Sequence, residues 1–154
     1  MSETTARRRE TAAGREPERC RIDVEVRYAE TDQMGVVHHA NYLIWFEQAR
    51  TRLCRDAGLH YADIERAGYF MMVTGAELRY VRSAHYGDDV TVTTWLSELG
   101  SRLASFEYEV RRGEELLVTG RTRHVWVRAE DSRPCRLPEM ARPYFERLAG
   151  RDRA

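Results

Sequence analysis

The 154-residue sequence contains no lysine, so all 25 of its basic residues are arginine. A Schiff-base or lysine-base mechanism is therefore excluded. The sequence also lacks any apolar run near the roughly 18 residues that a membrane span needs, and its formal net charge is zero. We therefore expect no membrane insertion and no nucleic-acid partner.

Several motifs of common enzyme and metal sites are missing as well. The three cysteines are odd in number and form no C-x-x-C pair, which favours free thiols in a reducing cytoplasm. The five histidines include no H-E-x-x-H motif, so we expect no metal site. There is no G-x-S-x-G motif, no G-x-G-x-x-G motif and no P-loop. This absence argues against a serine hydrolase, a dinucleotide-binding enzyme and an NTPase.

The composition, with 42% hydrophobic and 32% charged residues, is typical of one soluble globular domain. The first 19 residues carry almost no apolar side chains and four glutamates. We predict a disordered tail there rather than a signal or transit peptide. The predicted domain covers residues 20–148, and residues 149–154 form a second tail.

The stretch from Tyr28 to Arg52 combines a Gly-containing loop with a strongly apolar segment. We predict a helix from His39 or Ala40 to about residue 57, with Gly58 as its C-terminal stop. Because this helix is apolar on nearly every side, we expect other structure to enclose it.

Alternation of apolar and polar residues predicts a strand over 20–28, with Tyr28 at its end and pointing inward. Gly120 indicates a bulge or a close backbone approach, and we expect Pro143 to interrupt a short terminal helix. Together the pattern predicts an α+β domain whose sheet curls around the long helix. The remaining predicted elements are strands over 76–80, 90–96, 104–110 and 116–127 and short helices over 61–67 and 139–148.

Asp32 is the first candidate for chemistry, because its loop leads to a helix N-terminus with unpaired N–H groups. An aspartate in such a loop more often bonds nearby amides, and the spacing to His39 does not decide between the two. His38 and His39 are adjacent, so we expect their side chains to diverge. Most tyrosines at the inward-facing end of a strand are simply part of the core, and the pattern alone favours that role for Tyr28.

The motif YxxTDxMGVVHHANY, from Tyr28 to Tyr42, resembles the signature of the hot-dog-fold acyl-CoA thioesterases. It is most similar to the 4-hydroxybenzoyl-CoA thioesterase type, including the short bacterial enzymes associated with the Tol-Pal cluster. The downstream WFExAR and YGD sequences fit as well, and the resemblance covers about residues 20–148. It implies a five-stranded antiparallel sheet around one helix. It also implies a homodimer with active sites at the interface, and commonly a homotetramer.

The resemblance further implies hydrolysis of an acyl-CoA or acyl-carrier-protein thioester, with a small or medium acyl group, aromatic ones included, and no cofactor. Asp32 would act as general base or nucleophile, and the amide N–H of His39 would polarise the carbonyl. The side chains of Tyr28 and His39 are implicated in short-chain members. Arg102 would hold the CoA phosphates, although its two preceding neighbours carry no charge.

Two positions depart from the family pattern. Ala40 stands where many members have proline, the residue that suits the first helical turn, and Met34 replaces a small residue and so reshapes the acyl pocket. Two other functions remain open: a non-catalytic hot-dog module that binds acyl-CoA or a protein, and a hot-dog dehydratase that uses a histidine with an acidic residue.

Overall fold

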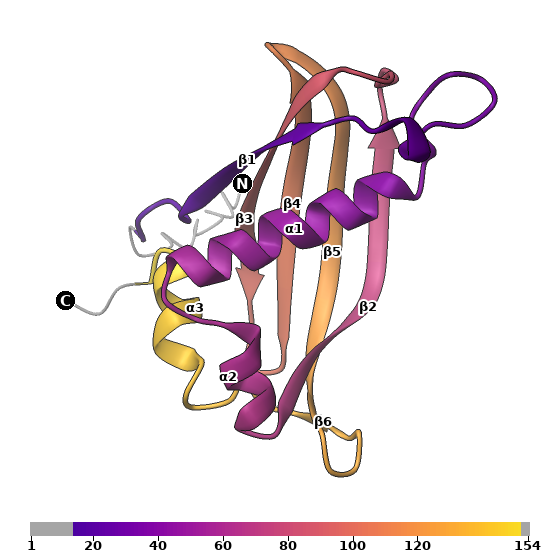
Figure 1. Cartoon of the computed structure of the whole chain (residues 1–154). Helices are drawn as coiled ribbons and strands as arrows, with labels where there is room; N and C mark the ends of the chain where they lie inside the picture. The colour runs from indigo at the N-terminus through magenta and orange to yellow at the C-terminus, as the bar shows by residue number, and fades with distance from the viewer. Residues whose placement is uncertain (1–13, 152–154) are drawn as a thin grey trace, which may run out of the picture.

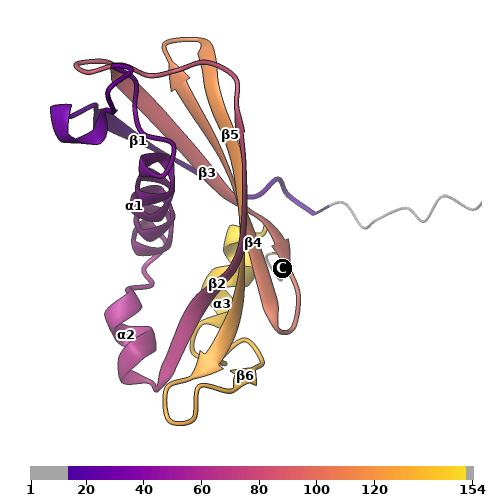
Figure 2. The same ribbon diagram turned by 90° about the vertical axis from the view of Figure 1, so that its right-hand side faces the viewer.

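The computed structural model describes residues 14–151, in which a curved antiparallel sheet carries one long helix on its inner side (Figures 1 and 2). The strand order is β1-β3-β4-β5-β2, and a two-residue strand, β6, pairs with β5. The predicted five-stranded sheet is thus confirmed, while β6 was not predicted. The strands are β1 Arg19–Glu25, β2 Tyr69–Tyr80, β3 Asp89–Leu99, β4 Leu103–Arg112, β5 Glu115–Arg128 and β6 Pro134–Cys135.

The helices are α1 Asn41–Asp56, α2 Tyr61–Arg66 and α3 Arg142–Leu148, with a short 3-10 turn, η1, at Tyr28–Glu30. The chain leaves α1 as predicted, because Gly58 adopts a φ of +98° that suits glycine. Pro143 lies in the first turn of α3, where its missing N–H costs no helical bond, so the predicted interruption is wrong. Within residues 14–151, no helix is long and apolar enough to cross a membrane.

The N-terminal strand is shorter than predicted. It ends at Glu25, and Tyr28 instead begins η1 with 77% of its surface exposed. The prediction that Tyr28 ends a strand and points inward is therefore wrong. Most of the predicted N-terminal tail, residues 1–13, and part of the C-terminal one, residues 152–154, lie outside the described part of the chain.

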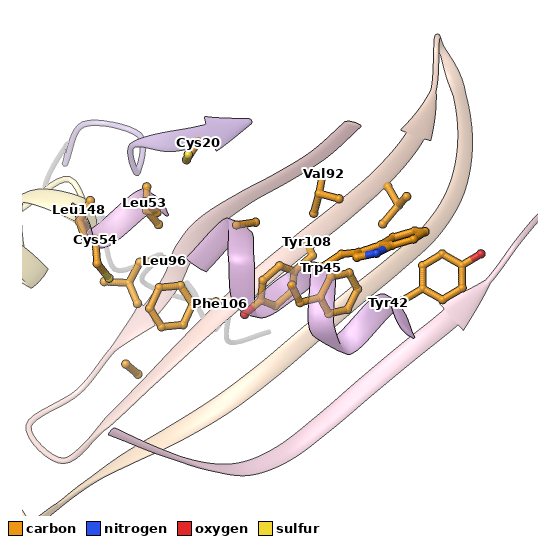
Figure 3. Close-up of a cluster of buried hydrophobic side chains, with 14 of the residues drawn as sticks. Cys20, Tyr42, Trp45, Leu53, Cys54, Val92, Leu96, Phe106, Tyr108 and Leu148 are labelled. Atoms are coloured by element: carbon orange, nitrogen blue, oxygen red, sulfur yellow. The ribbon is translucent and has the colours of Figure 1, made fainter. Parts of the chain in front are cut away.

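One face of α1 forms the centre of the core. Its buried side chains lie between the helix and the inner face of the sheet (Figure 3), and α1 contacts β1 and β3 most closely. On the opposite face, Leu43 and Ile44 are 39% and 49% exposed. The expectation that other structure encloses the helix is therefore wrong for the single chain. The buried residues of α1 are Tyr42, Trp45, Phe46, Ala49, Arg50, Leu53 and Cys54.

Gly120 of β5 allows α1 to approach the sheet. A Cβ atom at this position would lie 2.3 Å from Cε2 of Phe46. The Phe46 ring cannot easily retreat, because it is fully buried and stacks on Tyr108 with ring centroids 4.1 Å apart. Gly120 pairs regularly with residues of both neighbouring strands. Of the two readings of this glycine, the close approach is confirmed and the bulge is wrong.

Gly120→Ala is expected to lower the free energy of unfolding by about 2–3 kcal/mol, because the added methyl overpacks the contact with Phe46. Urea denaturation measures the change. Gly75→Ala is the matched control, since a Cβ there meets its nearest atom at 4.0 Å, on Arg123 of β5. Equal losses of stability in the two variants would contradict the close-approach account.

A chain of polar groups crosses the core beneath α1. Nη1 of Arg50 donates to the hydroxyl oxygen of Tyr108 at 2.9 Å, and this hydroxyl lies 2.6 Å from Oγ1 of Thr122. Oγ1 of Thr122 in turn lies 2.8 Å from Nε2 of His124. Burial of the His124 ring, and then the charge of Arg50, lower its pKa to about 3.

This depressed pKa predicts an acid-sensitive fold. His124 stays neutral in the folded state but gains a proton in the unfolded state below its ordinary pKa of about 6.5. Stability is therefore lost as pH falls from 6.5 toward 3, by up to about 1.4 kcal/mol per pH unit. Urea unfolding at pH 7, 6 and 5 measures this slope. His124→Gln should flatten it, and an unchanged slope in the variant would rule out His124 as its source.

Candidate active site

The residues between η1 and α1 form a small hairpin. Residues Thr31 and Val37 face each other as a β-bridge, and Asp32 N donates to Val36 O at 2.9 Å. Gly35 closes the turn with a φ of +78°. Val37 N donates to Ala84 O at 2.9 Å, which fixes the hairpin to the segment before β3. In Figure 1 this loop extends past the end of the sheet where β2 finishes.

Glu30 anchors the hairpin to the helix. Its buried carboxylate accepts the N–H of Arg27 at 2.9 Å and the indole N–H of Trp45 at 2.7 Å. Its carbonyl oxygen accepts His38 N at 2.8 Å and Nδ2 of Asn41 at 2.7 Å. Burial raises the pKa of the Glu30 carboxyl, but the hydrogen bonds from Arg27 and Trp45 outweigh this effect and hold the pKa below its usual value. The sequence analysis missed this role because Glu30 and Trp45 are 15 residues apart.

Asp32 has one carboxylate oxygen engaged and one open. Oδ1 accepts the backbone N–H of Met34 at 2.8 Å, which forms a local turn of the kind that Asp and Asn favour. Within residues 14–151 this is the single hydrogen bond of the carboxylate. The structural alternative, in which the aspartate bonds a nearby amide, is thus correct for Oδ1, while Oδ2 is available to a ligand.

The start of α1 leaves an unpaired donor near this loop. Ala40 N donates to Nδ1 of His38 at 3.2 Å and Asn41 N to the carbonyl of His38 at 2.9 Å. The carbonyl of His39 accepts the hydroxyl of Tyr80 at 3.0 Å. In the described part of the chain, the N–H of His39 has no acceptor. It lies at the positive end of the helix dipole, which favours a negatively charged oxygen.

The two histidines and Tyr28 lie on the surface of this region. The rings of His38 and His39 are 4.1 Å apart, so the prediction that they diverge is wrong. No cluster of three or more metal-binding side chains exists among residues 14–151. The Tyr28 ring contacts Tyr86 edge-on at 5.7 Å, and its carbonyl oxygen accepts the hydroxyl of Thr31. Tyr28 therefore belongs to the same loop as Asp32, but its ring points toward Tyr86.

Arg102 is not part of this cluster within one chain. It lies exposed in the turn between β3 and β4, whereas the Asp32 loop lies where β3 begins. β3 has 11 residues, which at about 3.3 Å each span roughly 36 Å. Figure 1 shows the two regions at opposite ends of the sheet. A single chain therefore does not bring Arg102 near Asp32.

Residues 26–145 match the family described as the thioesterase-like superfamily. The chain belongs to the thioesterase-like superfamily. The match includes the hairpin, α1 and every strand of the sheet except β1. It therefore covers both the fold and the candidate site. The resemblance inferred from the Tyr28–Tyr42 motif is confirmed.

Similar proteins agree with this assignment. YneP of Bacillus subtilis, provisionally named an acyl-CoA thioesterase, is 38% identical over 113 residues, which cover 73% of this chain and 82% of YneP. The acyl-CoA thioesterase YbgC of Haemophilus influenzae is 29% identical over 81% of this chain and 93% of its own. Both matches extend over most of each protein.

Solved structures show that members of the superfamily share this fold. A hypothetical protein from Thermus thermophilus is 40% identical, with a TM-score of 0.77 over 84% of this chain and 97% of that one. The DHNA-CoA thioesterase of Staphylococcus aureus is 36% identical, with a TM-score of 0.75 over 77% of this chain and 80% of that one. The predicted α+β hot-dog fold is confirmed.

Proposed function

We propose that this thioesterase-like protein hydrolyses acyl-CoA thioesters, with Asp32 and the amide of His39 as its catalytic groups. One observation carries the proposal: the loop from Asp32 to His39 presents the free Oδ2 of Asp32 and, at the helix N-terminus, the unpaired N–H of His39. Thioester hydrolysis needs a base or nucleophile and a donor for the oxygen that becomes negative. The loop supplies both.

In the general-base route, Asp32 takes a proton from a water molecule whose oxygen attacks the thioester carbon. The N–H of His39 donates to the carbonyl oxygen as it becomes negative. The C–S bond then breaks, and the CoA sulfur leaves as a thiolate that takes up the proton. In the nucleophilic route, Asp32 attacks the carbon itself and forms a mixed anhydride, which water hydrolyses to the same products. The exposed side chains of Tyr28 and His39 would contact the bound substrate.

The proposed enzyme is a homodimer, or a dimer of dimers, joined through β2. This strand is at the free edge of the sheet, is 12 residues long and exposes apolar side chains. Such an edge promotes pairing with another chain. Leu43 and Ile44 expose further apolar surface on α1. Light scattering should give a mass of at least twice the 18.0 kDa chain, and a monomer would contradict this arrangement. The exposed side chains of β2 include Phe70, Met72, Val73 and Tyr80.

A two-fold axis near the middle of β2 would also give Arg102 a role. Antiparallel pairing of two β2 strands brings the β3–β4 turn of one chain to the end of the joint sheet that carries the partner's catalytic loop. Arg102 would then hold the nucleotide phosphates of CoA bound at the partner's site. The free thiols of Cys20, Cys54 and Cys135 support a reducing, cytoplasmic location.

Product analysis tests the function. The protein is incubated with one acyl group carried either by CoA or by an acyl-carrier protein, and mass spectrometry follows the free acid and the free thiol. We expect equal amounts of acid and thiol from the CoA ester. Release from the carrier protein alone would show that the substrate is an acyl-carrier-protein thioester and not an acyl-CoA. Binding of acyl-CoA without any release would identify a binding module instead.

A further inference from the structure

A hollow of about 190 Å³ lies beside the middle of α1, between α2 and the first residues of β2. Its polar lining comes from Glu47, Arg50, Tyr61 and Glu65, and its apolar lining includes Ile64, Phe70 and Met71. An engineered apolar cavity of about 150 Å³ accepts one benzene ring. The hollow is therefore large enough for a compact acyl group of a few carbons or a single ring.

Arg50 is a buried cation without an anion. Only 8% of its surface is exposed, and among residues 14–151 it forms no ion pair with any carboxylate. Nη1 donates to Tyr108, but the buried Nε has no hydrogen-bond acceptor. An unpaired buried charge costs several kcal/mol. A guanidinium in this state is suited to bind a carboxylate with two parallel hydrogen bonds.

Tyr61 places a second buried polar group next to Arg50 at the same hollow. Its hydroxyl is buried and meets no acceptor at ideal hydrogen-bond geometry, but it lies beside the Arg50 guanidinium and the Cys54 thiol. Burial raises the pKa of this hydroxyl well above its ordinary value, so it stays protonated and can donate. Buried polar groups are rarely left unpaired. Arg50 and Tyr61 therefore form a buried polar pair behind the wall of the hollow, and a ligand carboxylate there would give the Arg50 guanidinium the anion that it lacks.

The acidic residues nearby do not supply the missing anion. Glu47 and Glu65 also line the hollow, but both are exposed and neither lies within ion-pair distance of Arg50. As exposed charges they are strongly screened by water and salt. Arg50 is therefore the buried charged group in the lining of the hollow.

We propose that this hollow receives the acyl group of the substrate and selects one that ends in a carboxylate, held by Arg50 and Tyr61. The inference rests on the proposed thioesterase function and gives its substrate class: CoA monoesters of short dicarboxylic acids. Arg50 and Tyr61 would bind the distal carboxylate, while the apolar lining contacts the methylene groups between it and the thioester.

The hollow would serve the catalytic loop of the partner subunit. Arg50 is 11 residues beyond His39, about 16 Å along the helix, which exceeds the reach of a compact acyl group from its own loop. A two-fold axis through the middle of β2 places the first residues of this strand, which line the hollow, beside the end of the partner's β2. That end lies next to the catalytic loop, because the hydroxyl of Tyr80 holds the carbonyl of His39.

Paired substrates of similar length test the selection. Glutaryl-CoA carries a distal carboxylate, and hexanoyl-CoA carries a methyl end. In the wild type, kcat/KM for glutaryl-CoA should exceed that for hexanoyl-CoA by about 10- to 100-fold, as expected for hydrogen bonds to a charged group. A ratio near one, with both esters hydrolysed, would overturn the inference and leave the thioesterase function intact.

Two variants assign the preference to the hollow. Tyr61→Phe removes only the hydroxyl beside Arg50 and keeps the ring, and it should lower the glutaryl-to-hexanoyl ratio about 10-fold. Arg50→Met should abolish the preference. Gln48→Ala, on the exposed side of the same helix, is the control and should keep the wild-type ratio. If Arg50→Met instead dissociates the oligomer with the ratio unchanged, Arg50 serves the subunit interface and the inference is wrong.

A binding measurement separates this inference from the proposed function. Calorimetry follows the titration of wild-type protein and Tyr61→Phe with free glutarate and with neutral glutaramide, which has the same length but no carboxylate. Binding of glutarate that weakens in Tyr61→Phe supports the hollow even if no ester is hydrolysed. Failure of glutarate to bind better than glutaramide would overturn the inference, whatever the outcome of the hydrolysis assay.

Discussion

Asp32→Asn is expected to lower kcat for thioester hydrolysis by about 1000-fold, with little change in the midpoint of thermal unfolding. The amide oxygen of asparagine can still accept the N–H of Met34, so the local turn is retained. The negative charge that activates water or attacks the carbonyl is lost. Initial rates of thiol release at saturating acyl-CoA measure kcat, and circular dichroism follows unfolding.

Two comparisons make this result specific to Asp32. Asp23→Asn, on an exposed position of β1, removes the same charge away from the loop and should retain full activity. Asp32→Ala should lose activity as Asp32→Asn does, and some stability as well, because it also removes the acceptor for Met34. A folded Asp32→Asn protein with more than about a tenth of wild-type kcat would show that the carboxylate is not the catalytic group.

His39→Pro is expected to lower kcat by about 100- to 1000-fold, the usual cost of losing one oxyanion donor. Proline removes the unpaired N–H but keeps the carbonyl that Tyr80 holds. Proline is also tolerated at the beginning of a helix, so the fold should persist. The same thiol-release assay measures the loss, and circular dichroism confirms that α1 remains.

His39→Ala is the matched variant, because it keeps the N–H and removes the imidazole. If the amide carries the effect, His39→Ala should retain most of the activity that His39→Pro loses. Equal losses in both variants would assign the catalytic role to the imidazole and contradict an oxyanion role for the amide.

The sequence was most informative where a local pattern decides the structure. The apolar stripe of α1 and the αL position at Gly58 predicted that helix to within two residues at each end. Strict alternation predicted β4, and the turn between β4 and β5 contains Gly113, whose φ of +60° suits glycine. These features depend on residues close together in the chain, so a single sequence contains the information.

The errors arose where distant residues decide. Alternation continued through Val26 to Tyr28, but the contact between Glu30 and Trp45 bends the chain into η1 and exposes Tyr28. β2 begins at Tyr69 rather than near residue 76, because its first residues pair with β5. The sequence did not predict this early start, since these residues form an apolar run without alternation. Neither contact partner can be identified from local spacing.

The candidate site was only partly predictable. The motif located Asp32 and the helix start, and family resemblance gave them roles. The open Oδ2 of Asp32, the unpaired N–H of His39 and the anchoring role of Glu30 became visible only with atomic contacts. The same is true of Arg50, which looks like an ordinary helix arginine in the sequence and is buried without a carboxylate partner among the described residues.

The most direct test of the central claim is the initial rate of thiol release from a panel of aliphatic, aromatic and dicarboxylic acyl-CoAs. Wild-type protein, Asp32→Asn and His39→Pro are assayed side by side at equal concentration. The account predicts rapid release by the wild type from at least one ester and a loss of about 100-fold or more in both variants. Equal rates in all three proteins, or no release from any ester by folded wild type, would contradict it.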